Sequence, residues 1–290
     1  MPTDLRTAAP PLPVARTRLA LRDQLHAWRA AGERIALVPT MGALHAGHLS
    51  LIDQARGHAD RVVVSIFVNP TQFAPHEDFN AYPREEALDL EKLAGVAAAL
   101  AYCPTVEEMY PPGDATTVQV GGPATGLESE SRPHFFGGVA TVVARLLIHC
   151  APDVAVFGEK DYQQLLVIRR MVTDLGLPVE ILAGPCVRED DGLALSSRNQ
   201  YLSASERRIA PAMHRALFAL SEALKGGTPV DAGVAAASGS MIEAGFSSVD
   251  YVAVRDAASL VPVTSLEKPV RLLAAARLGK TRLIDNIALT

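Results

Sequence analysis

The sequence is poor in cysteine: its 290 residues include only Cys103, Cys150 and Cys186, and no two of them have C-x-x-C spacing. An odd number of cysteines argues against a disulfide framework, and the missing C-x-x-C spacing argues against a structural zinc site. The composition fits a reducing compartment, and we therefore expect a cytoplasmic protein.

An excess of basic residues is also missing, because 27 Lys and Arg stand against 32 Asp and Glu, and the formal net charge is −5. Proteins that bind nucleic acids usually carry a basic surface, since they must neutralise many phosphates. Nucleic acid is therefore disfavoured as a substrate or partner. A small anion needs only a local cluster of donors and is compatible with this balance.

Long apolar runs are absent as well, and no stretch approaches the roughly 20 apolar residues that cross a bilayer. The first residues, up to about Arg18, contain Pro10, Pro11 and Pro13 and lack the continuous apolar core of a signal peptide. We expect a soluble protein with no membrane partner, whose first residues form a loose arm.

Hydrophobic residues make up 49% of the chain and charged residues 20%, which is enough apolar material for a substantial core. Strand and helix patterns alternate up to residue 184. The predicted strands cover residues 35–38, 61–68, 97–102, 153–157 and 178–184, and the predicted helices cover residues 17–31, 85–95 and 139–151, besides one that follows residue 48. Such alternation predicts an α/β fold with a doubly wound, Rossmann-like parallel sheet.

The pattern changes after residue 184. Residues 203–224 and 231–244 have helical patterns, whereas residues 249–254 and 270–277 resemble β-structure. We therefore predict a Rossmann-like domain over residues 1–184 and a smaller α+β domain over residues 185–290.

The most informative segment is Pro39–His48, which reads Pro-Thr-Met-Gly-Ala-Leu-His-Ala-Gly-His between a buried strand and a helix. A helix N-terminus presents unpaired N–H groups and the positive end of the helix dipole. Gly42 and Gly47 allow an anion to approach the backbone closely. His45 and His48 lie at the same mouth, so the segment predicts a phosphate site.

Two other segments follow predicted strands, at residues 69–73 and 158–161. In doubly wound sheets the ligand binds at the carboxyl ends of the strands, so we expect both segments to meet the histidines there. Neither the Gly-Lys-Ser/Thr end of a Walker A loop nor the His-Glu-x-x-His of a zinc protease is present.

Four segments, taken in order, resemble the pantothenate synthetase family of the nucleotidylyltransferase-like superfamily. They are residues 39–48, residues 65–73 (Ser-Ile-Phe-Val-Asn-Pro-Thr-Gln-Phe), residues 157–164 (Phe-Gly-Glu-Lys-Asp-Tyr-Gln-Gln) and residues 195–199 (Leu-Ser-Ser-Arg-Asn). The resemblance implies an ATP-dependent ligase that joins pantoate to β-alanine through a pantoyl adenylate and releases AMP and pyrophosphate. It also implies Mg²⁺ on the ATP phosphates and a homodimer.

The resemblance further implies which residues form the site. His45, His48, Lys160 and Arg198 would be catalytic, with His48 as the proton donor. The ATP site would comprise Met41, Gly42, Ala43, Leu44, His45, Ala46, Gly47, His48, Gly158, Glu159, Lys160, Asp161, Val187, Leu195, Ser196, Ser197 and Arg198. Gln72 and Gln164 would bind pantoate, because neutral amides can bond its hydroxyl and carboxylate without a tight ion pair. Asp89 would be a metal ligand.

The family pattern usually has Glu where Ala46 stands and Met where Leu195 stands, and neither departure removes a predicted phosphate ligand. Two other functions are compatible with the motifs: a nucleotidylyltransferase acting on a phosphorylated acceptor, and a nucleotide-binding regulatory protein without turnover. Structural roles are alternatives for single residues. The histidines could cap a helix, Ser196 and Ser197 could be N-caps, and Arg198 could pair with an acid among residues 189–191.

Overall fold

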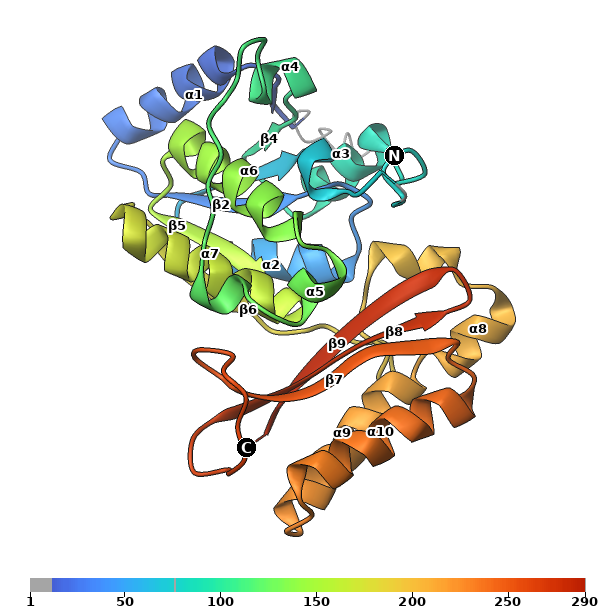
Figure 1. Ribbon diagram of the computed structural model, residues 1–290. Helices are drawn as coiled ribbons and strands as arrows, with labels where there is room; N and C mark the ends of the chain where they lie inside the picture. The colour runs from blue at the N-terminus through green and yellow to red at the C-terminus, as the bar shows by residue number, and fades with distance from the viewer. Residues whose placement is uncertain (1–11, 76, 290) are drawn as a thin grey trace, which may run out of the picture.

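The computed structural model describes residues 12–75 and 77–289, so most of the predicted N-terminal arm, residues 1–11, lies outside the described residues. Figure 1 shows a larger α/β part followed by a smaller part with a three-stranded sheet, which lies between the larger part and two helices. None of the described helices is long and apolar enough to cross a bilayer.

Within the described residues, six parallel strands form the first sheet in the order β1-β4-β3-β2-β5-β6. The strands are β1 Val14–Ala15, β2 Ile35–Thr40, β3 Arg61–Ile66, β4 Leu100–Tyr102, β5 Val154–Gly158 and β6 Glu180–Gly184. The chain runs outward from β2 to β3 and β4, then returns to β5 on the other side of β2. This confirms the predicted doubly wound fold and places the switch in strand order between β2 and β5.

Helices cover both faces of this sheet. They are α1 Arg18–Ala30, α2 Ala46–Arg56, α3 Glu86–Gly95, α4 Val106–Met109, α5 Glu128–Ser131, α6 Phe135–Cys150 and α7 Tyr162–Leu175. Alternate residues of β2 point to opposite faces: Ile35 and Leu37 pack with α1, α6 and α7, whereas Ala36 and Val38 pack with α2 and α3. Burial on both faces explains why β2 and β3 read as continuous apolar runs.

Several predicted boundaries were wrong. The strand expected from residue 97 begins only at Leu100, because Ala97 has a φ of +55° in the turn that ends α3. The helix expected from residue 139 already begins at Phe135. Val14–Ala15 is not a loose arm but an edge strand, since the amide of Ala101 donates to the carbonyl of Pro13.

The C-terminal part is an antiparallel sheet in the order β7-β8-β9, covered on one face by helices (Figure 1). Its elements are α8 Ala204–Ile209, α9 Ala212–Lys225, α10 Val230–Ala244, β7 Ser248–Asp256, β8 Val270–Leu278 and β9 Thr281–Leu289. The predicted helix over residues 203–224 is two helices, with Pro211 between α8 and α9. Strand β9 was not predicted. A boundary between residues 184 and 185 remains our proposal, and β6 ends at Gly184.

Candidate active site

A cavity of about 520 Å³, called the cleft below, lies at the carboxyl ends of β2 and β5 and extends to the C-terminal sheet. It brings together all four sequence segments singled out above. Predicted site residues that line it are Met41, His45, Gly47, His48, Gln72, Gly158, Lys160, Asp161, Gln164, Val187, Leu195, Ser196, Ser197 and Arg198. Predicted residues that are not among its lining are Gly42, Ala43, Leu44, Ala46, Asp89 and Glu159.

The loop after β2 is shaped by left-handed backbone and one buried acid. Gly42 has a φ of +82° and Ala43 a φ of +50°. Asp89 on α3 is 1% exposed, and its carboxylate accepts the backbone N–H groups of Ala43 at 2.9 Å and Leu44 at 2.8 Å. A Cβ on Gly42 would lie 2.9 Å from Asp89 Oδ2, so the loop needs glycine for space as well as conformation.

Asp89 thus holds the loop: it is 1% exposed and is not among the residues that line the cleft, and the metal-ligand role stays a prediction. Because the backbone N–H groups of Ala43 and Leu44 already donate to Asp89, they are not available for the phosphate contacts that the sequence predicted. The anion site at the start of α2 consequently depends on side chains more than the sequence suggested.

His45 and His48 lie at the start of α2 with their rings 4.1 Å apart. Burial, followed by the positive charge of Lys160, lowers the pKa of His45 to about 4. Burial, followed by the neighbouring His45 and then Lys160, lowers the pKa of His48 to about 3. Both rings are therefore neutral at pH 7.

The tautomer of His48 follows from a local hydrogen bond. The backbone N–H of His45 donates to Nδ1 of His48 at 3.4 Å, so Nδ1 must be unprotonated and Nε2 carries the proton. The alternative in which the histidines cap a helix is therefore correct for Nδ1 of His48. The other nitrogen remains as a hydrogen-bond donor, which is the form that can bond a phosphate oxygen without adding charge.

Lys160 and Arg198 bring positive charge to the cleft from two separate segments of the chain. Lys160 lies in the 3₁₀ turn Glu159–Asp161 that follows β5; its side chain is 20% exposed, and Nζ is 3.9 Å from an oxygen of Asp161. Arg198 lies in the 3₁₀ turn Ser197–Tyr201 and pairs with Asp78 at 3.1 Å. The predicted alternative, in which Arg198 pairs with an acid among residues 189–191, is wrong.

Gln72 is held firmly in the 3₁₀ turn Pro70–Gln72 that follows β3. It is 8% exposed; its Oε1 accepts from Asn69 at 3.1 Å, and its Nε2 donates to the sulfur of Met41 at 2.9 Å. Tyr110 in turn donates to Asn69 at 2.7 Å. Gln164 lines the cleft from the first turn of α7.

Sequence reasoning missed Asn69 and Tyr110 as supports of the Gln72 amide. Asn69 lies in one of the four motif segments, residues 65–73, and this position in the sequence could have marked it as a site residue. Tyr110 lies in a segment with no motif, and only the fold brings it to the turn.

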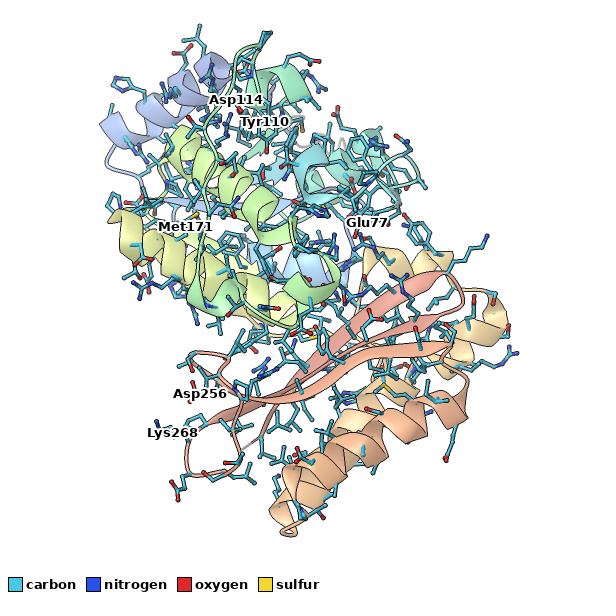
Figure 2. All side chains as sticks on the ribbon, viewed as in Figure 1. Glu77, Tyr110, Asp114, Met171, Asp256 and Lys268 are labelled. Atoms are coloured by element: carbon cyan, nitrogen blue, oxygen red, sulfur yellow. The ribbon has the colours of Figure 1, made fainter. Side chains whose placement is uncertain are left out.

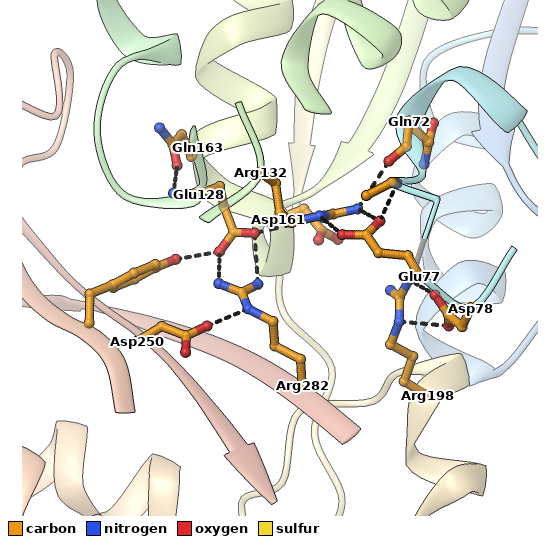
Figure 3. Close-up of polar contacts among 12 residues, drawn as sticks. Gln72, Glu77, Asp78, Glu128, Arg132, Asp161, Gln163, Arg198, Asp250 and Arg282 are labelled. Carbon is orange, nitrogen blue, oxygen red and sulfur yellow. Dashed lines mark hydrogen bonds and ion pairs between the residues drawn. The ribbon is translucent and has the colours of Figure 1, made fainter. Parts of the chain in front are cut away.

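Sequence reasoning also missed a network of ion pairs at the rim of the cleft (Figure 3). Arg282 on β9 donates to both oxygens of Glu128 on α5 at 2.8 and 2.9 Å and to Asp250 on β7 at 2.6 Å. Arg132 donates to Glu77 at 2.6 and 2.8 Å and to the carbonyl of Gln72 at 3.0 Å. Figure 2 shows Glu77 on the side of the larger part that faces the C-terminal part.

The described residues do not form a complete metal cage of their own. Across residues 12–75 and 77–289 there is no group of three or more His, Cys, Asp or Glu side chains that could hold a metal ion. Besides acids that lie beside its cations, such as Asp78 and Asp161, the cleft presents cations and neutral donors, namely Lys160, Arg198 and the two histidines. These groups suit a polyphosphate, and the amide of Gln72 suits a small polar acid.

Comparisons with known proteins point to one family. A family model described as pantoate-beta-alanine ligase matches residues 13–288. A pantothenate synthetase of Paramagnetospirillum magneticum is 56% identical over 94% of this chain and 96% of its own length. One of Caulobacter vibrioides is 55% identical over 95% of this chain and 98% of its own.

Solved structures are similar over the whole fold. Pantothenate synthetase from Thermus thermophilus matches with a TM-score of 0.90 at 46% identity, covering 96% of this chain and 99% of that one. A pantoate-beta-alanine ligase from Francisella tularensis, complexed with beta-gamma ATP and beta-alanine, matches with a TM-score of 0.78 at 33% identity over 96% and 98%. The resemblance drawn from four sequence segments is confirmed.

Proposed function

Since the chain belongs to the pantoate–β-alanine ligase family, we propose how its cleft carries out the ligase reaction. The enzyme condenses pantoate with β-alanine at the expense of ATP, through a pantoyl adenylate, and releases AMP and pyrophosphate. The observation that supports a single reaction chamber is that four separate segments bring His48, Gln72, Lys160 and Arg198 to one cavity.

In the first step the pantoate carboxylate attacks the α-phosphorus of ATP, and pyrophosphate leaves. A carboxylate is already ionised at neutral pH, so no general base is needed. The barrier comes from negative charge that accumulates on the triphosphate, and preorganised cations and donors lower it. We assign this role to Lys160, Arg198 and the neutral Nε2–H of His48, with His45 beside them.

Gln72 and Gln164 would hold pantoate. The Gln72 amide cannot rotate freely, because its two ends bond Asn69 and Met41. A fixed neutral amide orients the substrate and leaves its carboxylate unpaired and nucleophilic.

The adenosine would lie along Gly158, Asp161 and Val187, with Asp161 bonding the ribose. Ser196 and Ser197 would contribute hydroxyl groups to the phosphates. Both hydroxyls also bond the protein: Ser196 Oγ accepts the N–H of Arg198 at 3.3 Å, as the N-cap alternative expected, and Ser197 Oγ lies 3.1 Å from the Tyr82 hydroxyl.

In the second step the amine of β-alanine attacks the acyl carbon of the adenylate, and AMP leaves with the bonding electron pair. No protein nucleophile is required, and the three cysteines are poorly suited to that role because their thiols are not ionised. Burial raises the pKa of the Cys103 and Cys150 thiols to about 12 and also raises that of Cys186.

We also propose three properties that accompany this chemistry. Mg²⁺ would be carried on the ATP phosphates, since the described side chains form no metal cage. The enzyme would work in the cytoplasm, where ATP is available, and its three free cysteines are compatible with that compartment. It would be a homodimer, by resemblance to its family, and sedimentation analysis tests that.

The two alternative functions are disfavoured by the comparisons, which return ligases over nearly the full chain. The deciding experiment is mass spectrometry of the products formed from ATP, pantoate and β-alanine, together with exchange of labelled pyrophosphate into ATP. We expect pantothenate and AMP only when all three substrates are present, and exchange that depends on pantoate. A stable nucleotidyl product would indicate the transferase, and no turnover would indicate the regulatory protein.

A further inference from the structure

Asn286 on β9 belongs to the C-terminal part, yet it bonds the backbone of the turn that carries Lys160. Its side chain is among the most buried polar groups, at 3% exposure for the residue. The Nδ2 group donates to the carbonyl of Glu159 at 3.0 Å and to the carbonyl of Lys160 at 2.8 Å. One amide group thus engages two successive carbonyls of the 3₁₀ turn Glu159–Asp161.

The orientation of this amide is fixed by its other end. Oδ1 of Asn286 accepts from Nε of Arg271 at 2.6 Å, and Arg271 also contacts the Glu159 carboxylate at 3.2 Å. A guanidinium can only donate, so Oδ1 must face Arg271 and the NH₂ group must face the two carbonyls. Both hydrogens of the amide are therefore committed to the Lys160 turn.

The backbone of Asn286 is anchored from the opposite side. Its N–H donates to Asp285 at 2.7 Å, and Asp285 is held by Arg188 through two bonds of 2.7 and 2.9 Å. Asp285 is 5% exposed. This chain of bonds fixes where β9 presents the amide, so the position of the Lys160 backbone is set from outside the Rossmann-like sheet.

We propose that Asn286 is a positioning residue for adenylate formation: it holds the Glu159 and Lys160 carbonyls so that the Lys160 ammonium meets the reacting phosphoryl group. The inference deepens the proposed function and rests on the role assigned there to Lys160. It predicts that the first half-reaction depends on the C-terminal sheet, whereas acyl transfer to β-alanine depends on it far less.

A different explanation is that the Asn286 bonds merely hold the larger part and the C-terminal part together. Another bond between the two parts provides a control for this explanation. Tyr162 donates to the carbonyl of Ala257 at 2.8 Å, and this bond also joins the larger part to the C-terminal part. It does not involve the carbonyl of Lys160. Tyr162→Phe should therefore remove a comparable contact without moving the lysine.

The test measures both half-reactions in Asn286→Ala, Asn286→Asp and Tyr162→Phe. We expect both Asn286 variants to lower kcat of pantoate-dependent pyrophosphate exchange about 10- to 100-fold, as a small misplacement of a catalytic group does. The KM for pantoate and the rate from supplied pantoyl adenylate to pantothenate should stay near wild type. Asn286→Asp keeps the size of the side chain and the Arg271 contact and replaces only the NH₂ donor by an acceptor, so it removes the two carbonyl bonds without leaving a cavity.

A double-mutant cycle separates positioning from a general structural effect. In a Lys160→Ala background, Asn286→Ala should cause little further loss of exchange, because the group that it positions is gone. Four outcomes would overturn the inference. They are full additivity of the Lys160→Ala and Asn286→Ala effects on exchange, equal loss in both half-reactions, normal exchange in Asn286→Ala, and failure of both Asn286 variants to fold. If the wild-type enzyme itself lacks pantoate-dependent exchange, the proposed function fails instead.

Discussion

At the residue scale, the charge of His48 is governed by its surroundings. Burial, followed by the neighbouring His45 and the cation of Lys160, lowers its pKa from an ordinary 6.5 to about 3. Between these values the unfolded chain binds a proton that the native protein does not, so lowering the pH through this window favours unfolding. One such group costs up to about 1.4 kcal/mol for each pH unit below 6.5.

We predict that His48→Gln makes the ligand-free protein less sensitive to acid. Between pH 7 and pH 5 the wild type should lose about 2 kcal/mol more unfolding free energy than the variant. Urea denaturation at both pH values measures the difference. His58→Gln, which changes an exposed histidine, is the matched control and should behave as the wild type does. Identical acid sensitivity in all three proteins would contradict the buried, neutral state of His48.

A second prediction concerns Asp89, whose oxygens hold the N–H groups of Ala43 and Leu44. Asp89→Asn places an NH₂ group against one of these donors, so we expect a loss of about 1–3 kcal/mol in unfolding free energy. ATP affinity should fall as the loop loosens. Asp53→Asn, at an exposed position on α2, should cost little. Unchanged stability combined with a higher Mg²⁺ requirement for exchange would instead support a metal-ligand role.

Single residues of the site were predictable to different degrees. Histidine, lysine and arginine side chains lie in motifs whose chemistry is visible in the sequence, and His48, Lys160 and Arg198 indeed reach the cleft. The role of Asp89 was not predictable, because a carboxylate beside a predicted metal looks the same in sequence as one that binds a loop. Asn286 carries no local signal, since the two carbonyls that it holds are more than 120 residues away.

At the scale of elements, helix α6 touches the turn Pro70–Gln72, to which we assign pantoate binding, through a glycine. A Cβ on Gly138 would lie 2.3 Å from the carbonyl oxygen of Thr71 and 2.8 Å from the amide nitrogen of Gln72. These are backbone atoms, so the turn itself must move to accept a methyl group. The close approach also lets Asn69 donate to the carbonyl of Gly138 at 3.2 Å.

We therefore predict that Gly138→Ala raises the KM for pantoate in the exchange assay while ATP binding survives. The unfolding free energy should fall by about 1–3 kcal/mol, as for overpacking elsewhere. Gly239→Ala on α10 is the matched control, since a Cβ there meets no atom within 4 Å. It should stabilise the protein by up to about 1 kcal/mol, the helix preference for alanine over glycine. Normal pantoate binding in Gly138→Ala would show that the turn tolerates displacement.

The elements themselves were largely predictable where the apolar period is clear, as in β2, β3, α1 and α3, whereas α7 was not predicted. Shorter or weaker patterns failed for physical reasons. β4 supplies only Leu100–Tyr102 because the alanines before it form a turn, and Pro211 divides a continuous helical pattern. β9 was missed although its burial alternates at first, because Asp285 and Asn286 are buried polar residues that break the apolar pattern.

At the scale of the whole molecule, Arg282 ties the C-terminal sheet to the rim of the cleft. It bonds Glu128 and Asp250, and Tyr251 adds a bond of 2.8 Å to Glu128 (Figure 3). Removing Arg282 leaves the largely buried Glu128 with only the longer of the two ion pairs that it makes among the described residues, to Arg132 at 3.8 Å, and losing one partner of a buried pair costs about 3–5 kcal/mol.

We predict that Arg282→Met lowers the unfolding free energy by about 3 kcal/mol and speeds hydrogen exchange in α5. Adding Glu128→Gln should recover part of this loss, because the carboxylate that has lost this partner is then gone. Arg170→Met, which removes an exposed pair with Asp174 on α7, should cost less than about 1 kcal/mol. Equal costs for the Arg282 and Arg170 changes would mean that the network contributes no more than a surface pair.

The reversal of strand order between β2 and β5 has a practical consequence. The chain leaves these two strands toward opposite edges of the sheet, and the turn Pro70–Gln72, to which we assign part of the acid site, follows β3 and is separate from the connections after β2 and β5 that carry His48 and Lys160. An engineer who wants the enzyme to accept another carboxylic acid can rebuild the stretch Pro70–Gln72 and its backing glycine. His48 and Lys160, to which we assign the phosphates, lie outside that stretch and can be left untouched.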